Sequence, residues 1–461
     1  MEQKHNHLDT TNIPKLLRRL AIPATIGMLV NALYNLVDTI FIGQGVGADA
    51  IGGLAIAFPI QMVIMAIALM VGIGAASAIS RSLGERNIEK ANTIVGNAYV
   101  LCVFLSSIFV VIALAKTEEL LYLFGATDTL LPYAMDYIRI IFIGSIPFSF
   151  VMTSNNIIRS EGNAKESMMI MIIGTGLNII LDPLFIFVFK MGIKGAALAT
   201  ILSQFVSFLY VIHYLRSGKS HLKVAWHHLK PHGAMQLEIL KIGTPAFIRQ
   251  IGGSFLAIFL NNALGTYGGD IAITSYGIVN RLIMFLFMPM FGVVQAVQPI
   301  AGYNYGARRY QQIRDVVKLS IRSLVIYATL GWLVILLTSS KIGYIFTKDA
   351  IVVDTVAVQL KYITLMLPIV GIQITSGTVF QAFGKAFPAM ILSLLRQIIM
   401  LVPMLLLFPS VFGLGLLGIY IAFPISDVLS TLISGILLKR EMIHLKHEFL
   451  DASNRVGGKV N

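Results

Sequence analysis

Runs of about 20 or more apolar residues recur along the whole chain. A helix of that length crosses the ~30 Å hydrocarbon core of a bilayer and satisfies its backbone hydrogen bonds internally. The composition agrees, because 56% of the 461 residues are hydrophobic and only 12% are charged. We predict an all-α polytopic membrane protein with twelve spans, at residues 16–41, 53–80, 91–114, 131–154, 166–189, 195–215, 239–264, 273–301, 317–338, 357–379, 386–409 and 415–438.

Lys and Arg are distributed unevenly between the two sides of this predicted membrane. Of the 35 Lys and Arg residues, 24 lie in the tails and even-numbered loops, 5 in the odd-numbered loops and 6 in the spans. Residues near the end of a span are counted in the adjoining loop. Such an excess marks the cytoplasmic side. We therefore expect a multi-pass protein of the inner (plasma) membrane with both termini cytoplasmic and no removable signal peptide. The net charge of +13 is a topology signal and predicts no nucleic-acid partner.

The sequence repeats itself at an offset of 222 residues. This register pairs Pro23 with Pro245 and Arg86 with Arg308, and it also matches Ala24/Ala246, Gly43/Gly265, Met62/Met284, Gly84/Gly306, Gly162/Gly384, Ala164/Ala386 and Met168/Met390. After one inserted residue it continues through Gly192/Gly415, Gly195/Gly418 and Ser203/Ser426. A constant register that carries both Pro-Ala and Gly-x-Arg indicates a duplication.

Each repeat holds six spans, so both halves enter the membrane from the same side. The fold predicted is two six-helix lobes related by a pseudo-two-fold axis along the membrane normal. We assign residues 1–215 to an N-lobe, 216–238 to a cytoplasmic linker, 239–438 to a C-lobe and 439–461 to a cytoplasmic tail. Two facing bundles predict a central cavity and rocking between inward-open and outward-open states, which is transporter architecture.

Polar residues follow one face of the first span, in the stretch NLVDTIFIG and just before it. Gly27, Asn31, Tyr34, Asn35 and Asp38 lie at i, i+4, i+7, i+8 and i+11. An acid in the middle of a bilayer costs on the order of 2.5–3.5 kcal/mol, so this face must meet protein or water.

The fifth and sixth spans add further polar groups. Asn178 and Asp182 lie one helical turn apart, and Pro183 leaves the carbonyl of Ile179 without its helical donor. The sixth span presents Thr200, Ser203, Gln204 and Ser207 on one face.

If the first, fifth and sixth spans pack together, their oxygen-rich groups can hold a proton or a hard cation such as Na⁺. Polar contacts that join helices are the alternative, and it stays open for the hydroxyl groups. We favour a coupling site for the acids, because Arg139 is the one basic residue in this half's spans.

The second half lacks this cluster. In register, Leu260 replaces Asp38, Met400 replaces Asn178 and Met404 replaces Asp182. The polar residues of its spans include Asn261, Asn262, Asn280, Arg281, Gln295, Gln298, Gln373, Gln381, Arg396, Gln397 and Asp427. Because Asp427 is the one acid there, we predict a structural ion pair between Asp427 and either Arg281 or Arg396, with a coupling role as the alternative.

Other kinds of site are not indicated. The histidines at 221, 227, 228 and 232 match no metal-ligand spacing, so we interpret 216–238 as a solvated basic linker and expect no metal. No nucleophile–base–acid arrangement lies in the spans, so we expect no enzyme and no cofactor other than a coupling H⁺ or Na⁺. Single Cys102 excludes an internal disulfide.

The chain resembles the MATE (multidrug and toxic compound extrusion) family along essentially its whole length. The stretches that carry the resemblance are IPATIGMLVNALYNLVDTIFIG, SRSLGERNIEKA, IRSEGNAKESM, LNIILDPLFIF, GAALATILSQ and YNYGARRYQQIRD. Within the family the chain is most similar to the DinF-like and MepA-like branch. The NorM-like branch has carboxylates on helices seven and ten of the second lobe, whereas this chain has Asn261 and Asn262 on helix seven and no acid between 357 and 379.

The resemblance implies an antiporter that expels amphipathic, often cationic, drugs while H⁺ or Na⁺ enters. It implies a coupling site at Asp38, Asn178, Asp182 and Thr200 and a bend of the first helix at Pro23. We further expect Asn31, Tyr34, Asn35, Asn155, Asn156 and Gln204 to line the substrate cavity, with Met and Phe side chains as adaptable walls. The expected partners are small drug-like molecules and the lipid bilayer, and we expect a monomer. A lipid-linked saccharide flippase and an uncoupled channel or scaffold are the alternative functions.

Overall fold

The computed structural model describes residues 7–457, excluding the side chains of Asn35, Leu36, Thr39, Gly43, Ala48 and residues 450–457. Its first half contains α1 Ile13–Gly45, α2 Ala48–Gly84, α3 Ile88–Ala115, α4 Thr117–Leu123, α5 Leu131–Ser160, α6 Ala164–Pro183, the π-helical turn η1 Leu184–Val188 and α7 Gly192–Arg216. A short turn, η2 Trp226–Leu229, follows. The second half contains α8 Gly233–Gly306, α9 Tyr310–Ile342, η3 Gly343–Ile345, α10 Ala350–Ile363, α11 Leu367–Ala382, α12 Ala386–Leu394, η4 Leu395–Leu401, α13 Val402–Leu406, η5 Leu407–Val411 and α14 Gly415–Gly457.

Twelve segments of the described chain are long and apolar enough to cross a bilayer. Six belong to the first half: α1, α2, α3, α5, α6 with η1, and α7. In the second half, the 74 residues of α8 would span about 110 Å at 1.5 Å per residue, more than three times the hydrocarbon thickness. Gly269 interrupts α8 with a positive φ of 63°, so α8 crosses twice. The remaining crossings are α9, the pair α10 and α11, the segment from α12 to η5, and α14.

Two predicted spans are less regular than the sequence suggested. The span predicted at 357–379 is broken, because α10 ends at Ile363 and α11 begins at Leu367 with a bend of 55°. Pro368, in the first turn of α11, has no N–H to continue the preceding helix. The span predicted at 386–409 contains the wide turns η4 and η5. The short α4 was not predicted.

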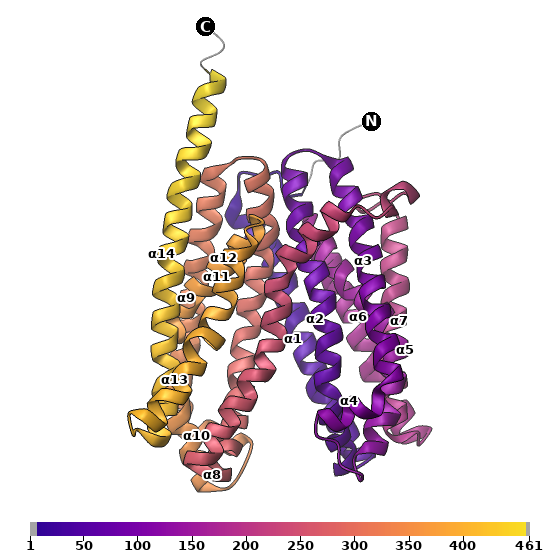
Figure 1. The fold of residues 1–461 in the computed structure, drawn as a ribbon, viewed down its shortest axis with the longest axis vertical. Helices are drawn as coiled ribbons and strands as arrows, with labels where there is room; N and C mark the ends of the chain where they lie inside the picture. Colours follow the sequence, from indigo (N-terminus) through magenta and orange to yellow (C-terminus); the bar gives the residue numbers. More distant parts are fainter. Residues whose placement is uncertain (1–6, 458–461) are drawn as a thin grey trace.

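The helices form two lobes (Figure 1), an N-lobe of α1–α7 and a C-lobe of α8–α14. α1 begins and α14 ends at the same end of the molecule, which we call the terminal end. The sequence repeat is also a repeat of conformation. Arg86 and Arg308, which are 222 positions apart, both adopt left-handed backbone angles, with φ of 59° and 54°. Each follows the end of a long helix, at Gly84 and Gly306 respectively.

Glycines let the two lobes touch through their backbones near the terminal end. A Cβ atom on Gly84 would overlap the carbonyl oxygen of Tyr303, and one on Gly306 would overlap that of Arg81. Gly74 and Gly243 make similar approaches across the same pair of helices, α2 and α8. We call this contact between α2 and α8 the seam.

Polar contacts also cross between the lobes. Ser77 Oγ donates to the carbonyl oxygen of Gln381 at 2.6 Å, and the Arg81 guanidinium pairs with Glu238 at 2.8 Å. The N-terminal segment adds an ion pair of 2.6 Å between Asp9 and Arg309 of the C-lobe, next to fully buried Leu8. The lobes are therefore closed against each other at the terminal end.

The segment between α7 and α8 is mostly exposed, and several of its residues also bond to the N-lobe. Glu161 accepts hydrogen bonds from Ser220 Oγ at 2.8 Å and from the His221 N–H at 2.9 Å. Asn97 bonds to the backbone of both His228 and His232. Burial raises the pKa of the Glu161 carboxyl, which lies in the loop after α5.

An ion pair lies inside the C-lobe. Arg396, on the wide turn η4, pairs with Asp427 of α14 at 2.5 Å, and its guanidinium lies 5.3 Å from the centre of the Phe287 ring. Ser426 Oγ donates to the carbonyl oxygen of Arg396 at 2.7 Å. Arg281, the other arginine considered as a partner, does not join this pair.

We expect Gly306→Val to open the seam, because the new side chain would overlap the Arg81 carbonyl. The measurement is the distance between spin labels at Ile88 and Gln311 in otherwise cysteine-free protein. The variant should lengthen this distance, whereas Gly176→Val, at a helical glycine with nothing within 4 Å, should not. An unchanged distance in Gly306→Val would contradict close backbone contact at the seam.

We expect Asp427→Asn to lower the free energy of unfolding by about 3 kcal/mol, because it leaves the Arg396 charge unpaired. That is the lower end of the range for buried pairs, since the Arg396 side chain keeps 21% of its surface exposed. Denaturation in detergent measures the loss. The double variant Arg396→Met with Asp427→Leu should lose less free energy of unfolding than Asp427→Asn does, because it leaves no charge unpaired. Equal stability of Asp427→Asn and wild type would show that the pair contributes nothing.

Candidate functional site

Two acids meet inside the N-lobe without a basic partner. Asp38 of α1 is 7% exposed and Asp182, at the end of α6, is fully buried. Their carboxyl groups lie within hydrogen-bonding reach of each other. No Lys, Arg or His of the described chain forms a salt bridge with either acid. Because ionised carboxylates only accept hydrogen bonds, a bond between the two requires a proton on one of them.

Asn178 and Thr200 complete the arrangement that the helical faces predicted. When the Asn178 amide is oriented to satisfy both of its ends, it donates to Asp182 Oδ2 at 2.8 Å and accepts from the Thr200 N–H at 3.1 Å. Thr200 Oγ1 donates to the carbonyl oxygen of Ala196 at 3.0 Å. The structure thus brings Asp38, Asn178, Asp182 and Thr200 together from α1, α6 and α7.

Three further side chains reach this cluster. Tyr34 and Tyr137 lie within hydrogen-bonding reach of Thr200, and Tyr137 also reaches Gln61 of α2. Gln61 and Tyr137 were not predicted from the sequence. Gln61 carried a signal, because it is the one amide in the apolar run 53–80. The sequence around Tyr137 offers no comparable signal beyond its own hydroxyl group.

The cluster has capacity to bind a cation. Asp38 Oδ1 is buried and has no hydrogen-bond partner among the described side chains and backbone. A buried unpartnered carboxylate oxygen is costly unless it carries a proton or meets a cation. The donors available nearby are carboxylate, amide and hydroxyl oxygens, the groups that hold either a proton or Na⁺.

The structure gives the expected cavity residues different surroundings. Asn31, Tyr34 and Gln204 are partly exposed, and the side chain of Asn35 lies outside the described residues. Asn155 is buried, and its amide bonds to Ser167 through two contacts. Asn156 is buried too, and its amide bonds to the carbonyl oxygen of Met152 and to Arg159. The placement of Asn155 and Asn156 argues against a cavity role, because helix packing already uses their polar groups.

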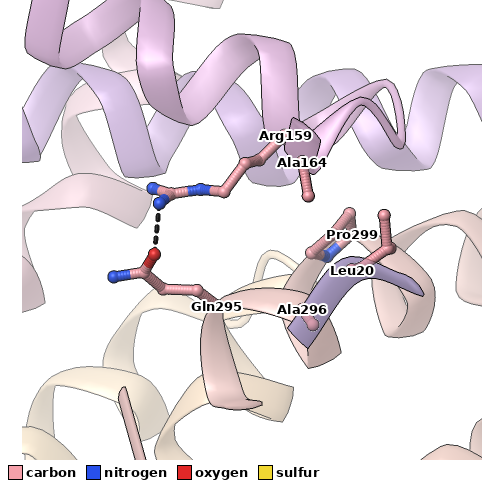
Figure 2. A pocket seen from close by; sticks show the side chains of 6 residues that line it. All are labelled: Leu20, Arg159, Ala164, Gln295, Ala296 and Pro299. Atoms are coloured by element: carbon pink, nitrogen blue, oxygen red, sulfur yellow. Dashed lines mark hydrogen bonds between the residues drawn. The ribbon is translucent and has the colours of Figure 1, made fainter. Parts of the chain in front are cut away.

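The Arg159 contact lies between the lobes. Figure 2 shows the Arg159 guanidinium of α5 donating to the Gln295 amide oxygen of α8, beside the apolar side chains of Leu20 and Pro299. Pro23, the expected bend, lies within continuous α1. Two residues further on, the backbone of Thr25 packs directly against Gly292 of α8. A change in α1 near Pro23 would therefore act on the contact between the lobes.

A possible metal group formed by Glu89, His227 and His228 does not fit a metal ion as it stands. His228 Nδ1 accepts a hydrogen bond from the Ala225 N–H at 2.9 Å, so the ring proton of the neutral side chain is on Nε2. That proton points to Glu89 at 2.9 Å. The nitrogen that faces the group has no free electron pair for a metal, and the three residues fasten the linker to α3.

Two known proteins are similar in sequence to this chain over most of its length. The chain is 28% identical to the "Multidrug export protein MepA" of Staphylococcus aureus (strain MRSA252) over 409 residues, which cover 88% of this chain and 90% of the relative. It is 30% identical to the protein of that name in Staphylococcus haemolyticus (strain JCSC1435), with the same coverage.

Solved structures match over nearly the whole chain. One is titled "Outward-facing conformation of a multidrug resistance MATE family transporter of the MOP superfamily", with 28% identity, a TM-score of 0.91 and coverage of 96% of this chain and 99% of that one. A second, "Crystal structure of MATE in the bent conformation", has 27% identity, a TM-score of 0.89 and coverage of 96% and 100%. The family model MatE matches twice, at residues 23–184 and 245–406, in the register of the 222-residue repeat. The chain belongs to the MATE family, whose members are transporters.

Proposed function

We propose that the protein is a secondary active multidrug efflux antiporter, which exports amphipathic and often cationic compounds in exchange for H⁺ or Na⁺. The observation that carries this proposal is the pair of buried acids, Asp38 and Asp182, with no basic partner in the described chain. The names of the MepA relatives support multidrug export. We place both termini on the cytoplasmic side of the plasma membrane, from the distribution of Lys and Arg.

The coupling step follows from the charge of the acid pair. When the site faces outward, a proton or Na⁺ neutralises it, α1 repacks and the drug leaves. When the site faces inward, the ion departs and the cavity reopens to the cytoplasm. Coupling free energies of about 1–3 kcal/mol are enough to bias such an equilibrium. The closeness of the two carboxyl groups favours H⁺, because a hydrogen bond between them would need a shared proton.

The state of the lobes fits this cycle. The seam closes the terminal end, which is the cytoplasmic end under our topology, and such closure is what an outward-facing state requires. Alternating access then requires the glycine contacts of the seam to separate. The Arg159–Gln295 hydrogen bond and the Asp9–Arg309 ion pair would break in the same step.

We expect Asp38→Asn and Asp182→Asn to reduce gradient-driven transport at least tenfold, because neither side chain can then carry a negative charge for the ion to neutralise. The measurement is accumulation of a fluorescent cation in proteoliposomes, with the proton and sodium gradients imposed separately. Asp49→Asn, at an exposed acid in the first turn of α2, is the matched control and should transport like wild type.

Two outcomes would count against the proposal, and a third would decide its coupling ion. Gradient-driven accumulation that survives in both variants would remove the coupling role of the acids. Dye flux that needs no ion gradient would indicate an uncoupled channel. Transport driven by sodium alone would retain the antiporter and replace H⁺ by Na⁺ as the coupling ion.

A further inference from the structure

The linker between the lobes has one side that is held by the protein and one that is open. Residues 217–232 are the part of it that joins α7 to α8, at the terminal end (Figure 1). The side chains of Leu222 and His228 are buried, whereas residues 223–227, between them, are all exposed. Trp226 is 89% exposed, more than any other large apolar side chain that the structure describes. An indole group this open to its surroundings indicates a contact that the chain itself does not supply.

Helix α3 fixes the depth of the linker in the membrane. The carbonyl oxygen of His228 packs against Gly96, where a Cβ atom would overlap it, and Asn97 bonds to the backbone of His228 and His232. α3 ends at Ala115, and a helix needs about 20 residues to cross the hydrocarbon core, so Gly96 lies at its boundary with the headgroups. The sequence agrees, because no Asn, Gln, His, Asp, Glu, Lys or Arg follows Asn97 in α3. The linker therefore lies at the level of the headgroups.

The linker also lies on the side of α3 that faces lipid. Val103 and Phe104 follow Gly96 and Asn97 by seven residues each, which is two helical turns and returns to the same face. These two apolar side chains are 40% and 59% exposed. In a bilayer, exposed apolar side chains at this depth contact acyl chains. The linker is therefore continuous with the surface through which the N-lobe contacts lipid.

The charge of the linker is positive. Residues 217–232 contain Lys219, Lys223 and Lys230 and no Asp or Glu. Lys219 lies 3.9 Å from Glu166, but neither Lys223 nor Lys230 forms a salt bridge within the described part of the chain. Glu89, the acid of α3 that contacts the linker, bonds to its two adjacent histidines. The two exposed lysines on either side of Trp226 are thus available to an anionic partner.

We propose that the linker is an interfacial anchor that binds anionic phospholipid in the leaflet at the terminal end. The indole of Trp226 lies among the headgroups, where an aromatic ring with one polar N–H is favoured. Lys223 and Lys230 bind the negatively charged headgroups beside it. The bilayer already covers the lipid-facing side of α3, so this contact needs no further partner. The inference goes beyond the proposed export function and does not depend on it.

The test uses the fluorescence of Trp226, because the chain has two tryptophans and Trp332→Phe leaves this one alone. The purified full-length variant is placed in phosphatidylcholine nanodiscs. These contain the same fraction of either phosphatidylcholine or phosphatidylglycerol brominated near the headgroup end of its acyl chain. Bromine quenches an indole only on contact, so we expect both lipids to quench Trp226. Brominated phosphatidylglycerol should quench about threefold more strongly, because the lysines favour an anionic headgroup.

Further variants make the result specific. In the same Trp332→Phe background, Lys223→Gln with Lys230→Gln should remove the preference for phosphatidylglycerol and retain quenching by brominated phosphatidylcholine. Lys439→Gln with Lys446→Gln removes two exposed lysines of α14 instead and is the matched control, which should keep the preference. If Trp332→Phe does not fold, the signal of Trp226 is the difference between wild type and Trp226→Phe.

The proposal is overturned if iodide in the water quenches Trp226 while neither brominated lipid does, since the linker would then face the aqueous phase and suit a protein partner. It is also overturned if the two brominated lipids quench equally before any lysine is changed. A preference that the α14 control loses as readily as the linker variant would assign it to the overall charge and remove the lysines of the linker from the account. Nanodiscs hold no ion gradient, so the result does not depend on whether the protein is an antiporter.

Discussion

The structure depends on one electrostatic constraint, which is that two carboxyl groups lie together inside an apolar bundle and form no salt bridge with a basic side chain of residues 7–449. Asp38 and Asp182 come from different helices, and Asn178 and Thr200 hold the second acid in place. Two bare negative charges at this spacing and in this medium would repel strongly. Under the proposed function, a mobile cation relieves this repulsion, and its arrival and departure give the N-lobe two states of different charge.

In the proposed mechanism, the duplicated architecture converts a local change of charge into movement between the lobes. The repeated Gly-x-Arg turns place Gly84 and Gly306 where the helix backbones of the two halves meet. Such contacts are either made or broken, because packed interfaces do not deform continuously. The repeats have also diverged in charge. The C-lobe has Leu260 and Met404 where the N-lobe has its acids, and it carries Arg249 and Arg281 on α8.

The sequence predicted those features that depend on one helix at a time. Apolar length located the spans, and helical phase placed Asp38 and Asn178 on inward faces that do meet. Features set by contacts between helices were not predictable. The bend before Leu367 and the wide turn η4 depend on packing, and Asn155 is bonded to Ser167 rather than free for a ligand. Gln61 and Tyr137 reach the acid cluster from α2 and α5, and which face of these helices meets the acids depends on packing.

The central claim is that the N-lobe acid pair holds a proton that substrate binding expels. The most direct measurement is proton release in weakly buffered detergent solution, followed with a pH-sensitive dye as a cationic substrate is titrated into the purified protein. The account predicts release of about one proton for each substrate bound, lost in Asp38→Asn even where the substrate still binds. Substrate binding to wild type without any release of protons, at every pH where the protein is folded, would contradict it.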